Sequence, residues 1–451
     1  MLYRLAFVIF ASSFRCYSTL IVLSPPGHHY DHYDSKRVVL YEFIRGFHRA
    51  ANETAREQVF AIADDNARRN LFVSYGVKDT VHGVLDDIWM RDMFVTQLSD
   101  TRVVRFRYRP AYLDQYTVNI IDKTTRQLVA EVWPNGEVRE LDLVLDGGGI
   151  VWEPSTMRAV VTERVLRDNP WLVNRTSLSA DGAPPSPRGR AAPYAGAPVI
   201  SAADLNTARS RLEAILSAAL VGADVGSGEA DGADVTVAII PEEAGAPRLG
   251  HVDGICNWLG PSTLALSAFS DAATYEIYRA RLIDAFGPAV SIVRFPYLPS
   301  NATWQDGFES ADGIYVNFAR TRDAVYVPTF GHATADAEAL ELVTAHADRP
   351  PIAINASAVA IMGGSVRCLS TFLWGTPAEQ LVALRAGLPS PAPPPPPVDD
   401  SGPLAAAIGI SSAAGALLIL LLSVANVWKA RRERKAATSK TEGHKGAAEA
   451  M

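Results

Sequence analysis

Residues 251–297 read HVDGICNWLGPSTLALSAFSDAATYEIYRARLIDAFGPAVSIVRFPY, and this stretch decides the fold. Two apolar runs with strand character, residues 251–260 and 263–266, precede a helical stretch at 272–286 and a closing strand at 290–297. The sequence therefore predicts a unit in which two strands are followed by a helix and then by a third strand.

The same order of elements recurs along the chain, starting near residue 88, residue 146 and residue 314. In the last of these copies, residues 314–318 are expected to pair with residues 324–327 across a turn. One such unit cannot bury its own apolar face, so the copies are expected to pack around a common axis. Polar residues near the starts of the units would then meet, although they lie far apart in the sequence.

The composition is that of a globular protein. Of the 451 residues, 48% are hydrophobic and 20% are charged. The net charge of −7 at pH 7 provides no basic surface for nucleic acid, so the composition argues against nucleic-acid binding.

Both ends of the chain have the character of membrane topology. Residues 1–18 resemble a secretory signal peptide, with a buried first strand as the alternative. Residues 404–428 contain no charged side chain and are long enough to span a bilayer, and the basic tail, 429–451, follows at once. We therefore expect a single C-terminal transmembrane helix, a cytoplasmic tail and a type I orientation, with the globular domain on the extracellular or lumenal side.

The rest of the chain divides into one domain and a stalk. The proline-rich residues 389–403 are expected to form a stiff, extended stalk, and residues 19–388 the globular domain. Within that domain, residues 177–198 are rich in Ala, Pro, Gly and Ser and are interpreted as a surface insertion. A glycoprotein is expected from the Asn-x-Ser/Thr sequons at Asn52, Asn174, Asn301 and Asn355.

The three cysteines are too few for a disulfide scaffold. Cys16 is expected to leave with the signal peptide, and a single bridge between Cys256 and Cys368 is left open. Cys368 follows the glycine pair Gly363 and Gly364, a setting in which the backbone can approach a ligand closely. A histidine and carboxylates that reach Cys368 in space would make it a nucleophile, whereas a lone cysteine is more often a small buried hydrophobic residue.

Other candidate site residues lie near the starts of the units, namely Asp92, Asp146, His251, Asp253 and Asn317. If residues 251–253 form a strand, the side chains of His251 and Asp253 lie on the same face. The same site would then contain a histidine for proton transfer and a carboxylate. Each of these residues also has a structural interpretation when taken alone, such as a turn or a surface ion pair. Their order and their place in the repeats favour a common site.

Five motifs together resemble the guanidino-group-modifying superfamily, the penteins, and within it the branch of agmatine deiminases and bacterial-type peptidylarginine deiminases. The motifs are Asp86-Asp87-Ile88-Trp89-Met90-Arg91-Asp92, Leu145-Asp146-Gly147-Gly148-Gly149-Ile150-Val151, Gly250-His251-Val252-Asp253-Gly254, Tyr315-Val316-Asn317 with Tyr326-Val327-Pro328, and Met362-Gly363-Gly364-Ser365-Val366-Arg367-Cys368-Leu369-Ser370. The resemblance extends over residues 19–377 apart from the insertion. It implies an α/β fold, a five-bladed, pseudo-symmetric α/β propeller with the site on its axis.

The resemblance also implies roles for individual residues. Cys368 would be the nucleophile and His251 the general acid and base, while Asp92 and Asp253 would bind the guanidinium of the substrate. The expected substrate-binding group is completed by Asn317, Asp146 and Trp89.

The enzyme that the resemblance implies is a hydrolase that converts a guanidino group to a ureido group and ammonia. It would act through a covalent thiouronium intermediate on cysteine, without a metal or a cofactor. Agmatine, arginine and peptidyl arginine are the small-molecule or peptide substrates that it implies, and agmatine would place the reaction in putrescine formation.

Two motifs depart from the family pattern. Many members have His before the catalytic Cys, where this chain has Arg367, and Glu-Gly-Gly-Asn in place of residues 146–149. Arg367 either lowers the thiol pKa of its neighbour or points away on the next pleat, and the pleat slightly favours the second. Outside these motifs, Arg105, Arg107 and Arg109 alternate, so they are expected to share a face that receives a substrate carboxylate, with a solvated edge strand as the alternative.

Two other functions stay open on the sequence alone. The first is a catalytically silent, membrane-tethered ectodomain that binds guanidino ligands or a partner. The second is a Cys-His-Asp hydrolase of peptides, against which the paired carboxylates argue. The oligomeric state is left open as well.

Overall fold

The computed structural model describes residues 19–385, apart from residues 25–30, 56, 64–76, 78–79, 86, 111–112, 135, 174–200, 222–233 and 243–249. The expected signal peptide, the insertion at 177–198, the stalk, the transmembrane helix at 404–428 and the tail lie outside the described residues and remain predictions. Within the described ranges, no helix combines the length and the apolar character needed to cross a membrane.

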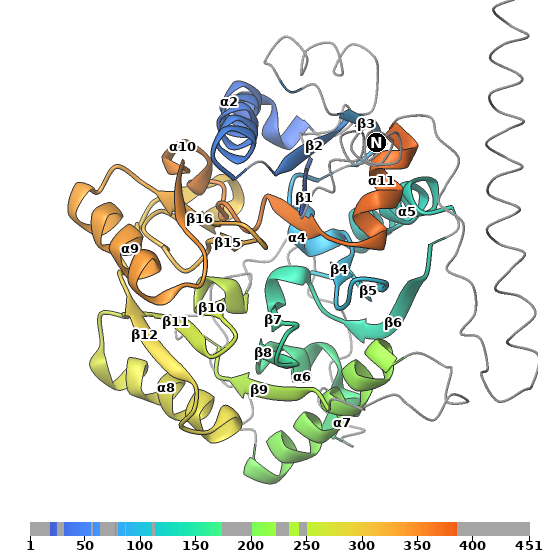
Figure 1. Ribbon diagram of the computed structural model, residues 1–451. Coiled ribbons are helices and arrows are strands. Elements are labelled where there is room, and N and C mark those ends of the chain that lie inside the picture. Colours follow the sequence, from blue (N-terminus) through green and yellow to red (C-terminus); the bar gives the residue numbers. More distant parts are fainter. Residues whose placement is uncertain are drawn as a thin grey trace, which may run out of the picture. The chain divides into compact units, whose positions relative to one another are not determined.

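Five small sheets surround a common centre, and each has the order of elements that the sequence predicts (Figure 1). In each sheet the first strand pairs antiparallel with the second, which pairs parallel with a third. A helical connection joins the two parallel strands, as a parallel crossover requires. The expected α/β propeller architecture is therefore present in the described part of the chain.

The strands are listed sheet by sheet. The first sheet contains β18 (Ser370–Leu373), β1 (Leu20–Leu23), β2 (Gln58–Ala63) and β3 (Thr80–His82). The second contains β4 (Thr96–Gln97), β5 (Val103–Arg107) and β6 (Val138–Val144), and the third β7 (Ile150–Glu153), β8 (Arg158–Thr162) and β9 (Thr236–Ile240). The fourth contains β10 (Cys256–Gly260), β11 (Thr263–Ser267) and β12 (Ser291–Phe295), and the fifth β15 (Ala319–Arg320), β16 (Val325–Thr329) and β17 (Pro351–Asn355).

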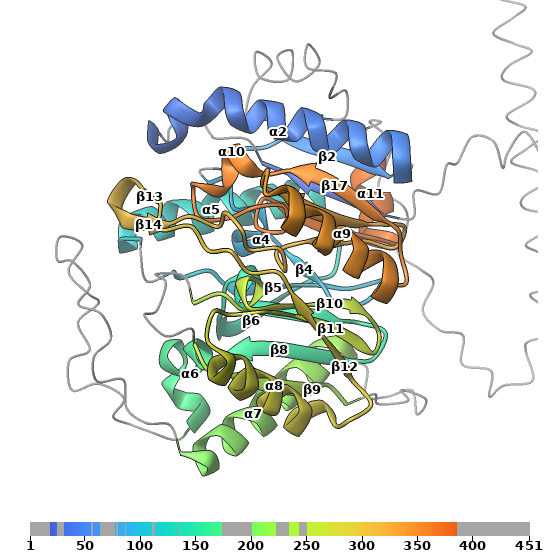
Figure 2. The same cartoon turned by 90° about the vertical axis from the view of Figure 1, so that its left-hand side faces the viewer.

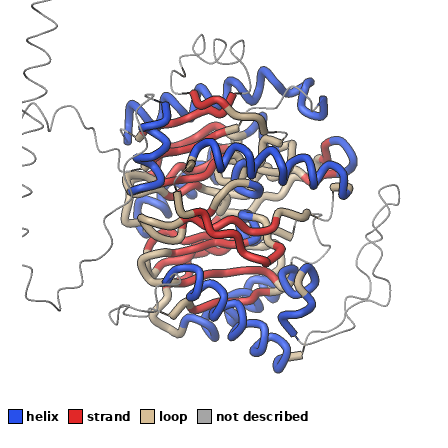
Figure 3. The backbone as a smooth tube through the Cα atoms, turned by 90° about the vertical axis from the view of Figure 1, so that its right-hand side faces the viewer, coloured by secondary structure: helices blue, strands red, loops and turns tan. Residues whose placement is uncertain are grey.

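The long helices lie on the outer side of the strands (Figures 2 and 3). They are α2 (Arg37–Ala50), α5 (Gln115–Val132), α7 (Ala202–Val221), α8 (Ala272–Phe286) and α9 (Ala333–His346). Shorter elements are α4 (Met90–Met93), α6 (Arg164–Asp168), α10 (Ser357–Ala360), α11 (Thr376–Arg385) and the pair β13 (Thr303–Trp304) and β14 (Phe308–Glu309).

Local sequence explains where α8 starts and stops. The Asp271 carboxylate accepts hydrogen bonds from the backbone N–H groups of Ala273 and Thr274, which otherwise lack a partner in the first turn. Gly287 ends the helix in a backbone conformation with φ of 74°, which residues with a Cβ rarely adopt. Helix α7 carries an apolar stripe, and its Leu212 and Leu216 are buried against the third sheet.

Two strand assignments from the sequence were wrong. Residues 252–254 form a short 3₁₀ turn and β10 begins only at Cys256, so His251 and Asp253 do not alternate along a strand. Residues 314–318 precede β15, whose Ala319 pairs with Tyr326. Both stretches are largely buried, and a short run with buried apolar residues does not distinguish a buried loop from a strand.

The ring is closed by strands from the two ends of the domain. Strand β18, near the C-terminal end, pairs antiparallel with β1, near the N-terminal end, and Leu373 lies opposite Leu20. Both leucines are fully buried in one cluster with Phe60 and Met90. The first sheet is therefore complete only when both ends of the domain have come together.

We expect Leu373→Ala to lower the free energy of unfolding by about 2–5 kcal/mol, because it removes buried contacts at this closure and leaves a cavity. Urea unfolding of the full chain, followed by tryptophan fluorescence, measures the change. The matched control is Leu298→Ala, since Leu298 is 49% exposed and should cost well under half as much. Equal losses in the two variants would contradict a structural role for the β18 closure.

Candidate active site

The segments that precede the first strands of the five sheets meet at the centre of the ring. Asp92 precedes β4, Asp146 precedes β7, His251 precedes β10, Asn317 precedes β15 and Cys368 precedes β18. Hydrogen bonds join them in sequence-distant pairs, including Asn317 to Cys368 and His251 to Asp146. The sequence therefore identified residues that the fold brings into one cluster.

The Gly363–Cys368 segment turns tightly beside Trp89. Gly363 has φ of 102°, a conformation that favours glycine. A Cβ on Gly364 would lie 2.5 Å from the Trp89 ring and 2.8 Å from the Cβ of Cys368, so only glycine fits there. Trp89 thus packs against the segment that carries the thiol.

Asn317 holds this segment through both ends of its amide. Its Oδ1 accepts hydrogen bonds from the Ser365 hydroxyl at 2.9 Å and from the Arg367 backbone N–H at 3.2 Å. Its Nδ2 donates to the Cys368 sulfur at 3.1 Å and to the Asp253 carbonyl at 3.3 Å. One buried amide therefore sets the position of the thiol relative to Asp253.

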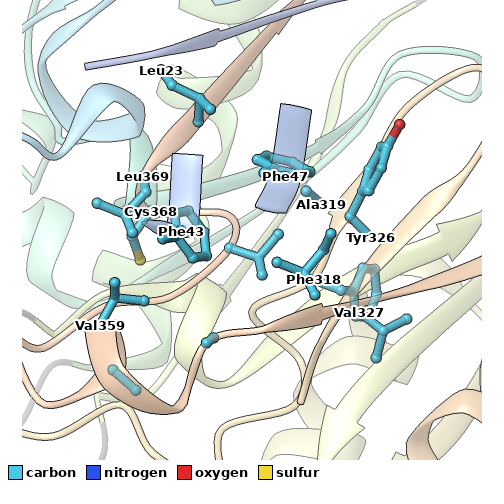
Figure 4. Packing of buried hydrophobic residues seen from close by; sticks show 14 of the residues in the cluster. Leu23, Phe43, Phe47, Phe318, Ala319, Tyr326, Val327, Val359, Cys368 and Leu369 are labelled. Carbon is cyan, nitrogen blue, oxygen red and sulfur yellow. The ribbon is translucent and has the colours of Figure 1, made fainter. Parts of the chain in front are cut away.

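Cys368 is 6% exposed and lies in a buried apolar cluster with Phe43 and Val359 (Figure 4). Its sulfur is 3.8 Å from Oδ2 of Asp253. Burial, followed by the charges of Asp253 and Asp92, raises the pKa of the Cys368 thiol well above its ordinary value. The neutral thiol is therefore the stable form in the free site. Cys256 is buried elsewhere and both thiols are free, so the disulfide that the sequence left open does not form.

His251 lies between two carboxylates. Its Nε2 is 3.2 Å from Oδ2 of Asp146, and its Nδ1 is 3.8 Å from Oδ1 of Asp92. Burial alone lowers the pKa of His251, but the negative charge of Asp92 and the hydrogen bond to Asp146 outweigh it and raise the pKa to about 9. Asp146, expected to bind substrate, is therefore engaged with the histidine.

Asp92 is held by the glycine segment that follows Asp146. Its Oδ1 accepts the Gly148 backbone N–H at 2.8 Å, and a Cβ on Gly148 would come within 2.7 Å of the same oxygen and 2.5 Å of His251. Burial raises the pKa of Asp92 to about 7, and the charge of His251 opposes this rise. The close approach of backbone, carboxylate and imidazole thus requires a glycine at position 148.

Arg367 forms a buried ion pair that sequence reasoning missed. Its Nη1 donates to Oδ2 of Asp253 at 2.7 Å, and its Nη2 donates to the Ile150 carbonyl at 2.9 Å. The guanidinium points to Asp253 and to the backbone carbonyls of Gly147 and Ile150, and the sequence analysis named none of these partners. An arginine in place of the family's usual histidine, next to a site rich in carboxylates, was the signal available for this pair.

The arginines of β5 do not form the face that their spacing predicted. Arg105 is 1% exposed and ion-paired with Asp122 of α5, whereas the half-exposed side chain of Arg107 pairs with Asp142. The pairing register of β5 shifts between the two residues, and this irregularity interrupts the alternation of faces. Strand β5 is also the middle strand of its sheet, so the edge-strand alternative was wrong too. Arg109 donates to Gln115 instead.

No group of three or more His, Cys, Asp or Glu side chains in the described ranges is arranged to hold a metal ion. The groups available for chemistry at the site are a thiol, an imidazole between two carboxylates, and the buried ion pair of Arg367 with Asp253.

We expect the free energy of unfolding to fall as the pH rises from about 6.5 to about 9, because of His251. The folded-state pKa of about 9 lies above the ordinary value of 6.5, so the stabilisation is complete below pH 6.5 and is lost as the pH passes 9. The loss is on the order of 3 kcal/mol. The pKa of Asp92 is raised from 3.8 to about 7, so Asp92 also lowers the free energy of unfolding as the pH rises, between about pH 4 and pH 7.

Urea unfolding of the full chain across this pH range measures the effect, and His251→Gln should flatten the curve above about pH 7. His346→Gln is the matched control, because His346 is exposed at the end of α9 and should leave the curve unchanged. A slope that persists in His251→Gln would disprove this assignment.

Residues 237–372 match the family of Porphyromonas-type peptidyl-arginine deiminases. A candidate agmatine deiminase of Marinomonas sp. (strain MWYL1) is 27% identical over 144 residues, which are 27% of this chain and 39% of that protein. The chain thus matches well under half the length of this curated relative.

Solved structures share the fold over most of the chain. The agmatine deiminase of C. jejuni covers 80% of this chain and 94% of its own, with a TM-score of 0.54 and 14% identity. The agmatine deiminase of Enterococcus faecalis covers the same shares, with a TM-score of 0.55 and 14% identity. A candidate arginine deiminase from Porphyromonas gingivalis covers 80% of this chain and 96% of its own, with a TM-score of 0.52 and 19% identity. The resemblance expected from the motifs is thus confirmed, by family sequence over residues 237–372 and by a fold shared with agmatine deiminases.

Proposed function

We propose that this protein is a guanidine deiminase, a hydrolase that converts a guanidino group to a ureido group and ammonia. The observation that supports it most is the meeting of Cys368, His251, Asp92 and Asp253 in one buried cluster. The relatives that share the fold bear the names of agmatine and arginine deiminases, which act on that group.

Substrate binding would use the two carboxylates. A guanidinium is planar and has paired N–H donors, which the carboxylates of Asp92 and Asp253 can accept. Asp253 makes its ion pair with Arg367 through Oδ2. A carboxylate has two oxygens with about four acceptor directions, so Asp253 can bind Arg367 and a substrate guanidinium together.

Substrate binding would also activate the thiol. The same carboxylates that raise the pKa of Cys368 would be neutralised by the bound guanidinium, so its cation favours the thiolate. The nucleophile then forms only when substrate is present, which protects the thiol in the free enzyme.

The reaction would proceed in two steps. The Cys368 thiolate forms a bond to the guanidinium carbon, and His251, protonated at neutral pH because of its raised pKa, gives its proton to the departing ammonia. The resulting thiouronium adduct is attacked by water, whose proton returns to His251. The carbon–sulfur bond then breaks and the second proton of that water passes to the leaving sulfur, which releases the ureido product and restores the Cys368 thiol.

The choice among agmatine, arginine and peptidyl arginine depends on the far end of the substrate. Arg105 and Arg107 each have a carboxylate partner within the chain, so they give no support to a substrate that carries a carboxylate. If agmatine is the substrate, the product leads to putrescine.

We expect Cys368→Ala to lower the rate of ammonia release by at least about 1,000-fold, because the covalent intermediate cannot form. Ammonia and ureido product are measured for the purified full chain with agmatine, arginine and an arginine-containing peptide. Cys256→Ala is the matched control, since this second buried thiol belongs to a different apolar cluster and its variant should stay active. Activity that survives in Cys368→Ala would rule out the mechanism.

Two observations favour a second candidate function, a silent domain that binds guanidino ligands or a partner. Arg367 already places a guanidinium on Asp253, and the Cys368 thiol is neutral in the free site. This alternative predicts tight binding of agmatine or arginine by calorimetry, no ureido product, and equal affinity in Cys368→Ser and the wild type.

We also propose a type I membrane protein with the described domain on the extracellular or lumenal side. The support is the uncharged segment 404–428 with its basic tail, and the apolar start of the chain. Three of the sequons, at Asn52, Asn301 and Asn355, are exposed on the domain and accessible to glycosylation.

In cells, the protein should therefore carry glycans that a glycosidase removes. Asn301→Gln should remove one step of the mobility shift, because Asn301 lies on an exposed loop. Protease added to intact cells or sealed microsomes gives the orientation. The topology would be refuted if protease added to intact cells left the domain uncut and the domain also carried no glycans.

A further inference from the structure

A cavity of about 770 Å³ lies at the far ends of the first strands, opposite the segments that carry the candidate active site. Its wall includes Gln97 at the end of β4, Glu153 at the end of β7, Arg320 at the end of β15 and Trp374 just after β18. Cys368, His251, Asp92 and Asp253 are not part of its lining. We call it the axial cavity. Its volume is within the range of about 300–1,000 Å³ typical of small-molecule sites.

The lining of the axial cavity is net positive. Five arginines and three carboxylates line it, namely Arg91, Arg320, Arg322, Arg349 and Arg367 against Asp100, Glu153 and Asp348. The carboxylates are largely used within the wall, because Arg320 pairs with both Glu153 and Asp348. An anion entering the cavity therefore meets more positive than negative charge.

Arg91 is a buried cation of this wall whose N–H groups are not all hydrogen-bonded. It is 7% exposed, yet its Nε and Nη2 have no hydrogen-bond acceptor among the described residues, and its guanidinium lies over the Phe372 ring at 4.8 Å. Burial, and then the charge of Arg367, lower the pKa of Arg91 to about 9. The charges of Asp253 and Asp92 partly oppose this lowering, but N–H donors of a buried guanidinium that lack an acceptor remain costly unless a ligand supplies one.

The unpaired groups of the wall are all of one kind. Four buried N–H donors of lining residues lack an acceptor, two on Arg91 and one each on Trp152 and Trp258. None of the described lining residues has a buried side-chain acceptor without a donor. The wall thus has an excess of donors, and a ligand rich in acceptor oxygens complements it.

We propose that the axial cavity is a binding site for a small oxyanion, a carboxylate or phosphate group, held by the guanidinium of Arg91. Arginine matches both groups, because its N–H donors form a planar fork. The bound oxygens would supply the acceptors that Arg91 lacks and would balance its charge.

The site is close in the chain to the catalytic cluster. Arg91 precedes Asp92, and its backbone N–H donates to the Cys368 carbonyl at 3.1 Å. Arg367, which lines the cavity, precedes Cys368 and pairs with Asp253. An anion bound to Arg91 would therefore lie close enough to influence the charges of the catalytic cluster. Its binding can be measured without any turnover.

The test is a calorimetric titration of the purified full chain with inorganic phosphate and, separately, with succinate. Sodium chloride keeps the ionic strength constant, so that non-specific screening does not change. We expect saturable binding of at least one probe, with a dissociation constant raised at least about tenfold in Arg91→Gln. Phosphate alone would indicate a phosphorylated ligand, and succinate alone a carboxylate.

Arg107→Gln is the matched control, because this half-exposed arginine lies outside the cavity and should bind the probes like the wild type. If Arg91→Gln does not fold, Ser99→Trp serves instead, since it adds bulk at a partly exposed position of the wall and should block binding. The proposal fails if neither probe binds the wild type. It fails equally if both probes bind the Arg91 or Ser99 variant as tightly as the wild type.

Discussion

The pairing of β18 with β1 is the interaction on which the rest of the structure depends. It joins the two ends of the domain in one sheet and thereby turns a row of similar units into a closed ring. Cys368 lies two residues before β18, so the same pairing positions the thiol. Every other site residue precedes the first strand of its own sheet, and the closed ring brings these segments face to face.

Within the ring, buried charges of opposite sign hold one another in place. Three carboxylates, those of Asp92, Asp146 and Asp253, are gathered around a histidine and an arginine. A buried carboxylate without a partner would take up a proton, so the neighbours of each carboxylate matter. Asp253 has the strong partner Arg367, whereas Asp92 shares a histidine with Asp146 and has its pKa raised by burial to about 7. Burial thus makes the Asp92 carboxylate take up a proton more readily than an ordinary aspartate does.

The fold and the identity of the clustered residues could be predicted from the sequence, because they rest on repeated patterns. The order strand, strand, helix, strand appears in local periodicity, and site residues stand at the same place in each unit. The local structure around His251 and around residues 314–318 could not be predicted, since buried loops and buried strands are equally apolar. The ion pair of Arg367 with Asp253 and those of Arg105 could not be predicted either. Such pairs depend on which side chains face each other across sheets, and periodicity within one segment does not contain that information.

The late position of β18 also has a consequence for the order of events during synthesis. Leu20 and Leu373 are separated by most of the domain, so their pairing has a very high sequence separation. A chain that leaves the ribosome N-terminus first cannot complete the first sheet until residues 370–373 have emerged. The inner units can form earlier from local contacts, but the ring and its centre appear only at the end. The thiol therefore cannot enter its polar surroundings before residues 370–373 have been synthesised, and a chain that ends before them lacks the site.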